Sequence, residues 1–402
     1  MRIALDARAW NWTGIGRYIR NLTAEYLKNS GGHSFTLLVP KGEEEKIKRE
    51  LENSVIPGLT RNPEKTDATP GSRLGGRDDD GRREVTFEYV GVEPSYYSLK
   101  EQTVFLRQLN ALKNIDLVHF AHFNVPIFYN KPFVVTIHDI TRFIFPGQKR
   151  QSLLQQIGYE YVFAHAVRSA KKVIAVSNTT ARDMRLLPFR ARSTEVIYEG
   201  LEDRFFQPIS ASQKNSVRAY IKIKTPYIVF VGVWMSHKNI FRLIDAFALV
   251  HKNYPDLSLV ITGKYQDGYS DLLRYVGEKG LVPQVIFPGF VPDELLPALY
   301  AESAGMAFPS LYEGYGLPPL EAQACGAPVI ASNVSSMPEL LRDSVEYVNP
   351  ESIGDIARGI KKVVNDDAYA QKVRTAGLRN VERYSTVRMA KEHIRVYENA
   401  LQ

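Results

Sequence analysis

Residues Pro309 to Leu340 read PSLYEGYGLPPLEAQACGAPVIASNVSSMPEL and place an acidic, glycine-rich loop directly before a helix. The prolines of LPPLEA fall in the first turn of that helix, where a missing amide donor costs no hydrogen bond. The apolar runs MAF before the loop and VIAS after the helix indicate short buried strands. The amides of Tyr315 to Leu317 therefore point out of a helix N-terminus at a strand end, a position that suits a phosphate group.

Two acids accompany this helix start, Glu313 in the loop and Glu321 eight residues later. Eight residues of helix span roughly 12 Å, whereas two carboxylates that act on one glycosidic bond lie about 5 to 9.5 Å apart. The spacing therefore indicates two acids that address different parts of one long ligand. A helix that merely carries two surface acids is the alternative.

The length of 402 residues suggests two or three domains, and an apolar content of 44% is enough to build their cores. The single cysteine, Cys325, excludes a disulfide framework and a cysteine-based metal site, and we expect it to pack as a small apolar residue. No apolar run reaches the roughly 18 residues of a membrane span, and the opening MRIALDARAW turns polar too soon for a signal peptide. We therefore expect a cytoplasmic protein.

The net charge of +7 is unevenly spread, because seven Lys or Arg residues lie between Arg168 and Arg192 with one acid, Asp183, among them. Such a surface could contact nucleic acid, anionic lipid or a phosphorylated acceptor. No nucleic-acid-binding motif accompanies the stretch, so we favour the lipid and the acceptor and expect no nucleic-acid partner. An ordinary solvated surface is the alternative.

Strand-like and helix-like runs alternate along the chain, which indicates an α/β fold. Near-continuous apolar runs such as IDLVHFAH and PFVVTIHDI are typical of parallel sheets. Gly14, Ile15 and Gly16 join the first strand, RIALDA, to a helix, and this geometry lets the backbone approach a phosphate, with a simple tight turn as the alternative. His138 ends a strand where open parallel sheets face their ligand crevice; a capping histidine is the alternative.

Residues 54–84 interrupt this alternation with a segment rich in Pro, Gly and balanced charge, which we expect to be a disordered insertion. The closely spaced acids Asp78 to Asp80 fall inside it. The histidines His119, His122 and His138 lie on separate segments without the spacing of metal ligands. No metal site is therefore predicted.

The stretch from Pro309 to Leu340, together with TGIGRY near the N-terminus, TIHD at a strand end and Lys238–Asn239 before a helix, resembles the E-x7-E glycosyltransferases of the retaining GT-B type, family 4. That family includes bacterial mannosyl- and glucosyltransferases. The resemblance implies two facing Rossmann-like domains, an acceptor domain at 1–205 and a nucleotide-sugar donor domain at 206–385. It also implies that a terminal helix at 386–402 crosses back to pack on the first domain.

The resemblance assigns a role to each matching position. Glu313 would lie beside the transferred hexose, His138 would hydrogen-bond that hexose, and Glu321 would hold the ribose of the donor. Lys238 would neutralise the leaving diphosphate as a point charge. The further donor-binding positions that it implies are Gly14, Ile15, Gly16, Gly314, Tyr315, Gly316, Leu317, Gly263 and Val291.

One position departs from the family pattern, because Val233 stands where an arginine is common. Charge stabilisation would then fall more heavily on Lys238, with help from His237. Since these groups and the helix N-terminus would take the negative charge, we expect neither a metal nor another cofactor besides the donor.

The wording of the motifs is most similar to bacterial mannosyltransferases of polysaccharide assembly, which implies GDP-mannose as donor. A saccharide or polyprenyl-linked acceptor at the inner membrane face would agree with the basic stretch. Three alternatives stay open: a related enzyme that uses UDP-glucose, UDP-galactose or UDP-GlcNAc, a phosphorylase-like or hydrolytic enzyme, and an inactive sugar-nucleotide-binding scaffold. The missing arginine at Val233 favours the scaffold.

Overall fold

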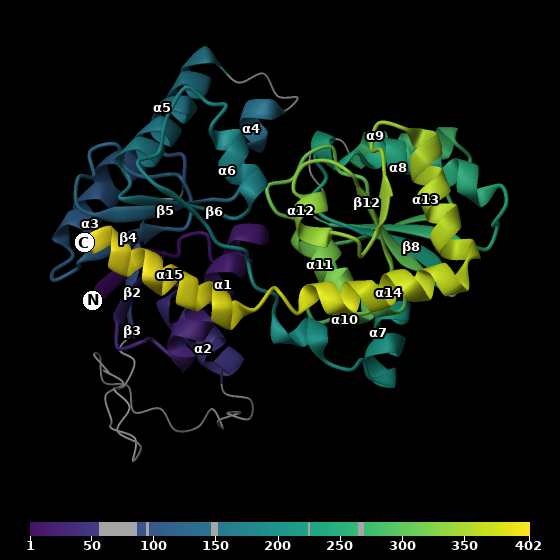
Figure 1. Ribbon diagram of the computed structural model, residues 1–402, viewed down its shortest axis with the longest axis horizontal. Coiled ribbons are helices and arrows are strands. Elements are labelled where there is room, and N and C mark those ends of the chain that lie inside the picture. Colours follow the sequence, from purple (N-terminus) through teal and green to yellow (C-terminus); the bar gives the residue numbers. More distant parts are fainter. Residues whose placement is uncertain (56–86, 94–95, 146–151, 224–225, 264–268) are drawn as a thin grey trace.

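A computed structural model of the chain describes residues 1–55, 87–93, 96–145, 152–223, 226–263 and 269–402. The described residues form two α/β domains that lie side by side (Figure 1). The predicted insertion at 54–84, with Asp78 to Asp80, lies outside these residues from position 56 onward.

The N-terminal domain is built on a seven-stranded sheet of order β3-β2-β1-β4-β5-β6-β7, in which every pairing is parallel. Its strands are β1 (Arg2–Asp6), β2 (Ser34–Pro40), β3 (Phe87–Val92), β4 (Leu117–Phe120), β5 (Phe133–Ile137), β6 (Lys172–Ala175) and β7 (Thr194–Val196). Its helices are α1 (Gly14–Lys28), α2 (Glu44–Val55), a π-helical turn (Glu101–Phe105), α3 (Leu106–Ala111), α4 (Thr141–Ile144), α5 (Leu153–Ser169) and α6 (Asn178–Met184).

The C-terminal domain repeats this plan with a six-stranded parallel sheet of order β10-β9-β8-β11-β12-β13. Its strands are β8 (Tyr227–Val231), β9 (Ser258–Thr262), β10 (Val285–Gly289), β11 (Gly305–Phe308), β12 (Val329–Ser332) and β13 (Glu346–Val348). Its helices are α7 (Ala211–Ile221), α8 (Ile240–His251), α9 (Tyr269–Glu278), α10 (Leu296–Ala301), α11 (Leu317–Ala324), α12 (Met337–Leu341), α13 (Ile353–Asn365) and α14 (Asp367–Val381). Short 3-10 turns cover Asp203–Phe206 and Ser236–Lys238.

The strand order changes direction between β1 and β4 in the first sheet and between β8 and β11 in the second. Ligands bind outside the carboxyl ends of parallel strands at such switch points. The loops after β1, β8 and β11 carry Gly14 to Gly16, Lys238 and Glu313 to Glu321. His138, Gly263 and Val291 follow the neighbouring strands β5, β9 and β10. The two-domain α/β fold therefore places the predicted site residues at the carboxyl edges of both sheets, where parallel sheets bind their ligands.

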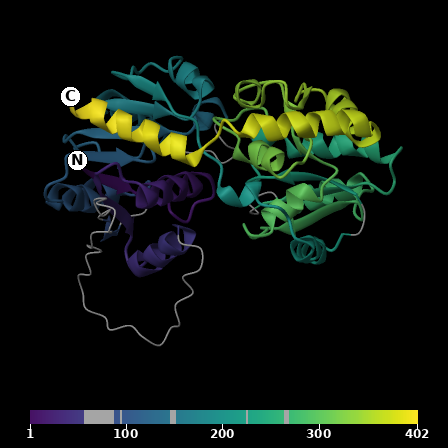
Figure 2. The same cartoon turned by 60° about the horizontal axis from the view of Figure 1, so that its bottom comes forward.

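The last helix, α15 (Thr386–Leu401), leaves the second domain and packs against α1 and β5 of the first. Figure 2 shows it running back along the N-terminal domain toward the N-terminus. The chain crosses here at close range, because a Cβ at Gly200 would lie 2.4 Å from the backbone nitrogen of Thr386. The predicted crossover helix is therefore confirmed.

Two local expectations differ from the structure in their bounds. The run YEYVFAHAVRSAKK, Tyr159 to Lys172, predicts a helix, but α5 begins earlier, at Leu153, where Ser152 and Gln155 form a capping box, and ends at Ser169. The run VTFEYV predicts a strand over Val85 to Val90; its first two residues lie outside the described ranges, and β3 continues to Val92.

A buried polar contact fastens α15 to the first domain. Nδ1 of His393 lies 2.7 Å from the carbonyl of Met389, which can only accept, so this nitrogen donates. Nε2 of His393 then accepts from the hydroxyl of Tyr18, whose oxygen lies 2.8 Å from Oγ1 of Thr136. A neutral ring of His393 satisfies both contacts, with Nδ1 as donor and Nε2 as acceptor.

The contact continues through a second histidine. Nε2 of His119 lies 2.8 Å from Oγ1 of Thr136, and Nδ1 lies 2.7 Å from the hydroxyl of Tyr397 on α15, which in turn accepts from Tyr26. Burial, with a smaller contribution from the neighbouring histidines, lowers the pKa of His119 well below its usual value. Two neutral histidines thus belong to one continuous hydrogen-bonded chain between α15 and the first sheet.

We expect this chain to make the fold acid-sensitive between pH 6.5 and 4. Burial lowers the pKa of His393 to about 4, so the unfolded chain takes up a proton below about pH 6.5 that the folded chain refuses. Stability from this group is therefore full above pH 6.5 and falls, by roughly 3 kcal/mol in total, as the pH drops to 4. Denaturant unfolding of the wild type and of His393→Gln should show a shallower acid loss in the variant. At pH 8 His393 is neutral in the folded and the unfolded chain, so the difference in stability between the two proteins at that pH measures the packing effect alone and is subtracted. An equal loss of stability with falling pH in both proteins would contradict the assignment.

Candidate active site

A cleft of about 1670 Å³ lies between the two domains. The predicted site residues that line it are Gly14, Ile15, His138, Lys238, Gly263, Val291, Glu313, Gly314, Tyr315, Gly316, Leu317 and Glu321. The structure thus gathers into one cleft residues that are up to 307 positions apart in the chain. Gly16 is not among the lining residues. A Cβ there would lie 2.4 Å from the carbonyl oxygen of Trp10, so Gly16 permits close packing of the α1 start.

Lys238 and Glu313 meet at the centre of the second domain's cleft wall. The Nζ atom of Lys238 lies 2.7 and 2.8 Å from the two carboxylate oxygens of Glu313. Both side chains are largely buried, and the ammonium also lies 5.3 Å from the ring centre of Phe308. A diphosphate bound at this point would compete with Glu313 for the ammonium of Lys238.

The loop that carries Glu313 is held by the first domain. The carbonyl of Gly314 accepts hydrogen bonds from Ser177 Oγ at 2.6 Å and Thr180 Oγ1 at 3.1 Å, both at the start of α6. A Cβ at Gly314 would lie 1.9 Å from the carbonyl oxygen of His138, so no other residue could make this approach. The amides of Tyr315 to Leu317 lie at the N-terminus of α11, before its first intrahelical hydrogen bond, and so have no acceptor within that helix.

Glu321 lies deeper and has a different set of partners. One carboxylate oxygen pairs with Arg17 and the other accepts from the hydroxyl of Tyr300 at 2.9 Å. Arg17 also lies 3.1 Å from Asp293 and 3.7 Å from Glu202. Although burial opposes its charge, Glu321 and Asp293 raise the pKa of Arg17 above its ordinary value.

Sequence analysis missed Arg17, which reaches from α1 across the cleft to the second domain. Its signal was present, because Arg17 follows Gly16 directly in TGIGRY. Its partners could not be read from the sequence, since Glu321 lies 304 residues away.

His138 lies between two hydrogen-bond acceptors. Its Nδ1 is 3.2 Å from Glu199 Oε1 and its Nε2 is 3.0 Å from the carbonyl of Ala121. The carbonyl of Ala121 can only accept, so Nε2 of His138 donates to it. The ring of Tyr18 packs edge-on against it at 4.9 Å. Glu199 and Tyr18 therefore set the orientation of His138 at the cleft wall.

His237 lines the cleft but does not replace the missing arginine. Burial, and then the nearby charge of Lys238, lower its pKa below the ordinary value, so the ring is neutral at pH 7. Val233 also lines the cleft. His237 therefore adds no positive charge of the kind that the missing arginine would supply, and its help to Lys238 stays a prediction.

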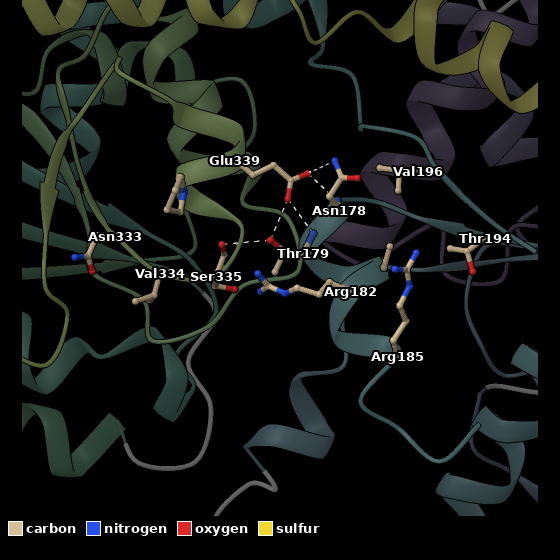
Figure 3. Close-up of a pocket in the computed structure, with 12 residues that line it drawn as sticks. Asn178, Thr179, Arg182, Arg185, Thr194, Val196, Asn333, Val334, Ser335 and Glu339 are labelled. Atoms are coloured by element: carbon tan, nitrogen blue, oxygen red, sulfur yellow. Dashed lines mark hydrogen bonds between the residues drawn. The ribbon is translucent and has the colours of Figure 1, made fainter. Parts of the chain in front are cut away.

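A second interdomain contact involves Glu339 of the MPEL motif, whose role the sequence left open (Figure 3). Its carboxylate accepts from the amides of Asn178 and Thr179 at 2.7 and 2.9 Å and from the Thr179 hydroxyl at 3.0 Å. Arg182 and Arg185 line the same pocket, which has a volume of about 690 Å³. Glu339 thus ties the second domain to the start of α6, beside the bonds that hold Gly314.

Three further expectations concern the chain as a whole. Within the described ranges, no group of three or more His, Cys, Asp or Glu side chains is arranged to hold a metal ion. No helix in the part of the chain that the structure describes is both long and apolar enough to cross a membrane. Cys325 ends α11, where burial raises the pKa of its thiol, as expected for a packed apolar residue.

Two family models match the chain, one in each domain. Glycosyltransferase Family 4 matches residues 12–205, and Glycosyl transferases group 1 matches residues 212–379.

The chain is also similar to characterised proteins. It is 28% identical over 300 residues to O-antigen chain mannosyltransferase B of Escherichia coli. This match covers 73% of the chain and 77% of that relative. It is 33% identical over 199 residues to the serotype-specific mannosyltransferase WbdA of Escherichia coli, over 48% of this chain but only 24% of WbdA. Among solved structures, Anabaena Alr3699/HepE in complex with UDP and glucose matches with a TM-score of 0.74 over 99% of both chains at 19% identity.

These matches and the two facing parallel-sheet domains agree with the resemblance in the motifs. The chain belongs to the glycosyltransferases, with a Family 4 domain followed by a group 1 domain in the GT-B fold.

Proposed function

We propose that this chain is a retaining, metal-independent mannosyltransferase that uses GDP-mannose and acts on a saccharide or polyprenyl-linked saccharide in cell-surface polysaccharide synthesis. The observation that carries the proposal is the pairing of Lys238 with Glu313 beside the N-terminus of α11 in the interdomain cleft. The mannosyltransferase names of the relatives support the sugar. A UDP-glucose donor is the second candidate, because the similar HepE structures contain UDP, glucose or UDP-glucose.

In the proposed reaction, the bond between C1 of the hexose and the diphosphate oxygen breaks, and its electron pair leaves on the diphosphate. Lys238 and the amides at the N-terminus of α11 stabilise that negative charge. The carboxylate of Glu313 lies beside the electron-poor sugar while an acceptor hydroxyl adds to C1 and passes its proton to the departing diphosphate oxygen. Without donor, the charges of Lys238 and Glu313 neutralise each other. As the bond breaks, Lys238 pairs with the leaving diphosphate instead, and Glu313 pairs with the electron-poor sugar.

The purified chain is expected to transfer mannose from GDP-mannose to a mannoside acceptor, also in excess EDTA, with the donor's α configuration kept in the product. Lys238→Ala should lower kcat about 100- to 1000-fold, the effect of removing one charge-stabilising group. Glu313→Gln should also lower kcat while GDP-mannose still stabilises the fold. Radiolabel transfer and NMR of the product measure these outcomes.

The matched control is Lys279→Ala, which removes a lysine from a surface pair with Asp245 outside the cleft. Its rate should equal that of the wild type. Turnover of UDP-glucose but not of GDP-mannose would contradict GDP-mannose as the donor and support UDP-glucose in its place. If transfer survived both cleft substitutions, the site assignment would be wrong, and absence of transfer with any donor would support the scaffold alternative.

Arg17 provides a separate test of the ribose role of Glu321. In Arg17→Ala the buried carboxylate of Glu321 loses its charged partner, so thermal stability without donor should fall by several kcal/mol. Ribose hydroxyls would then offer Glu321 new donors, and the donor should raise the melting temperature more in the variant than in the wild type. This extra shift should vanish in Arg17→Ala combined with Glu321→Gln. Equal donor shifts in all three proteins would exclude a ribose contact.

We also propose that the first domain contacts anionic lipid through α5. The first half of α5 exposes four large apolar side chains to between 61% and 81%: Leu153, Leu154, Ile157 and Tyr161. The second half of α5 is buried through Phe163, Ala166 and Val167, whereas residues 152–158 are exposed on every side. Large apolar side chains that gather on an exposed part of one helix indicate an interaction surface.

The surface near the C-terminal end of α5 is basic. The exposed members of the basic stretch are Arg168, Lys171, Arg182, Arg185, Arg190 and Arg192. Arg168 at the end of α5 reaches the segment that follows α6 through the carbonyl of Pro188. Exposed apolar residues with neighbouring positive charge suit the headgroup region of an anionic bilayer.

Co-sedimentation with phosphatidylglycerol vesicles checks this contact. Leu154→Gln combined with Ile157→Gln should reduce binding at least tenfold, and raised salt should weaken the binding that remains. Val282→Gln, an equally exposed apolar position in the second domain, is the control. If the double variant bound like the control, α5 would not be the contact surface.

A further inference from the structure

A group of aromatic side chains from the first domain lines one arm of the cleft, outside the predicted donor contacts. Its members are Trp12, Tyr97, His122, Phe123 and Tyr159, with Arg142 beside them. The ring of His122 lies 5.7 Å from Trp12 and 5.9 Å from Tyr97, and the guanidinium of Arg142 lies 4.2 Å from the ring centre of Tyr159. We call this group the aromatic cradle.

Trp12 and Tyr97 are unusually open for side chains of this size, with 38% and 56% of their surface exposed. Exposed aromatic rings that gather in a cleft, rather than singly on a surface, indicate a ligand contact. The cradle also adjoins the sugar end of the predicted donor site, because His122 follows Ala121, whose carbonyl bonds His138.

The backbone of Tyr97 is strained to hold its ring in this place. Its φ of +65° is in the left-handed region, which bulky residues rarely adopt. Strain of this kind persists only where surrounding structure enforces it, and it gathers at functional sites.

A buried ion cluster enforces the strained turn. Oε2 of Glu101 accepts from the Tyr97 amide at 3.1 Å and from Asn124 at 3.1 Å, while its Oε1 lies 2.8 Å from Arg8. Arg8 is fixed in turn by Asp6. The buried charges of Asp6, Arg8 and Glu101 therefore stabilise the turn that exposes the ring of Tyr97.

The position of the cradle selects its ligand. The donor diphosphate is proposed at Lys238 of the second domain, which also carries the predicted donor-binding positions Gly263 and Val291. The first domain contributes Gly14 and Ile15 to the predicted donor contacts, at the start of α1. The cradle belongs to the first domain alone. A hexopyranose presents a C–H face that packs on aromatic rings and hydroxyls at its rim that accept from a guanidinium.

We propose that Trp12 and Tyr97 form the floor of an acceptor subsite against which a hexopyranose ring stacks, with Arg142 donating hydrogen bonds to its hydroxyls. The inference rests on the proposed function, because it takes the acceptor to be a saccharide. It adds the claim that this acceptor is recognised through a sugar ring at named side chains, whatever lipid follows.

Fluorescence of the full chain titrated with α-linked mannotriose, without donor, tests the subsite. A saturable change is expected in the wild type and should be absent in Trp12→Ala. In the transfer assay, Trp12→Ala and Tyr97→Gly should each raise the acceptor KM roughly tenfold, with the donor KM unchanged.

Tyr97→Gly separates this role from a structural one, because glycine adopts a φ of +65° without strain. The variant should be at least as stable as the wild type and still bind acceptor more weakly. Phe128→Ala removes an exposed aromatic ring of the same domain that does not line the cleft, and it should change neither quantity.

The outcomes distinguish this inference from the proposed function. If GDP-mannose raises the melting temperature but mannotriose gives no fluorescence change and both variants keep the wild-type acceptor KM, the subsite is refuted and the donor site stands. If no nucleotide sugar binds while mannotriose still alters Trp12 fluorescence, the cradle stands and the proposed donor chemistry fails.

Discussion

The contact that the cleft depends on is a hydrogen bond between the domains, from the hydroxyl of Ser177 to the carbonyl of Gly314. It presses the loop of the second domain onto the first so closely that only glycine fits against the His138 backbone. Glu313, the residue before Gly314, is thereby held where Lys238 reaches it. Because one side of this contact belongs to each domain, any change in the angle between the domains moves the carboxylate of Glu313 relative to the cleft wall of the first domain. Glu339 reinforces the same arrangement by occupying the start of α6.

Two other sets of buried polar groups keep the domains in this relation. Arg17 joins α1 to Glu321 and Asp293 across the cleft. Because the pair with Glu321 is buried, the loss of either partner would leave an uncompensated charge and destabilise the fold. The histidine chain of α15 uses neutral groups instead, where the crossover helix lies on the first sheet. The pairs that bridge the cleft are thus charged, whereas the histidine chain of the crossover helix is neutral. This division suits a site where charged groups exchange partners with a ligand while the scaffold does not.

Much of the fold could be predicted from local patterns. The apolar run SFTLLVP predicts a strand and forms β2 at Ser34 to Pro40. Ser177 and Asn178 are both candidate caps of the next helix in the sequence KVIAVSNTTARDM, and Ser177 caps α6. Apolar runs and capping residues act within a few positions, so sequence alone reveals them. The start of α5 was misplaced because its first turns expose apolar side chains and therefore lack the period of a half-buried helix. The assigned roles of Glu313, His138, Lys238 and Glu321 remain predictions, although the structure brings all four to one cleft.

The sequence by itself determined the class of fold, the family and the candidate acids, because these follow from apolar periodicity and from short motifs whose residues are neighbours in the chain. Only the tertiary structure decided which charges meet. The pairs of Lys238 with Glu313, Arg17 with Glu321 and Glu339 with α6 join residues that are 75 to 304 positions apart. Nothing in a local pattern encodes such pairs, since they arise from the packing of two sheets and a returning helix. The same reason explains why the strained ring of Tyr97 and its buried ion cluster became visible only after the chain was folded.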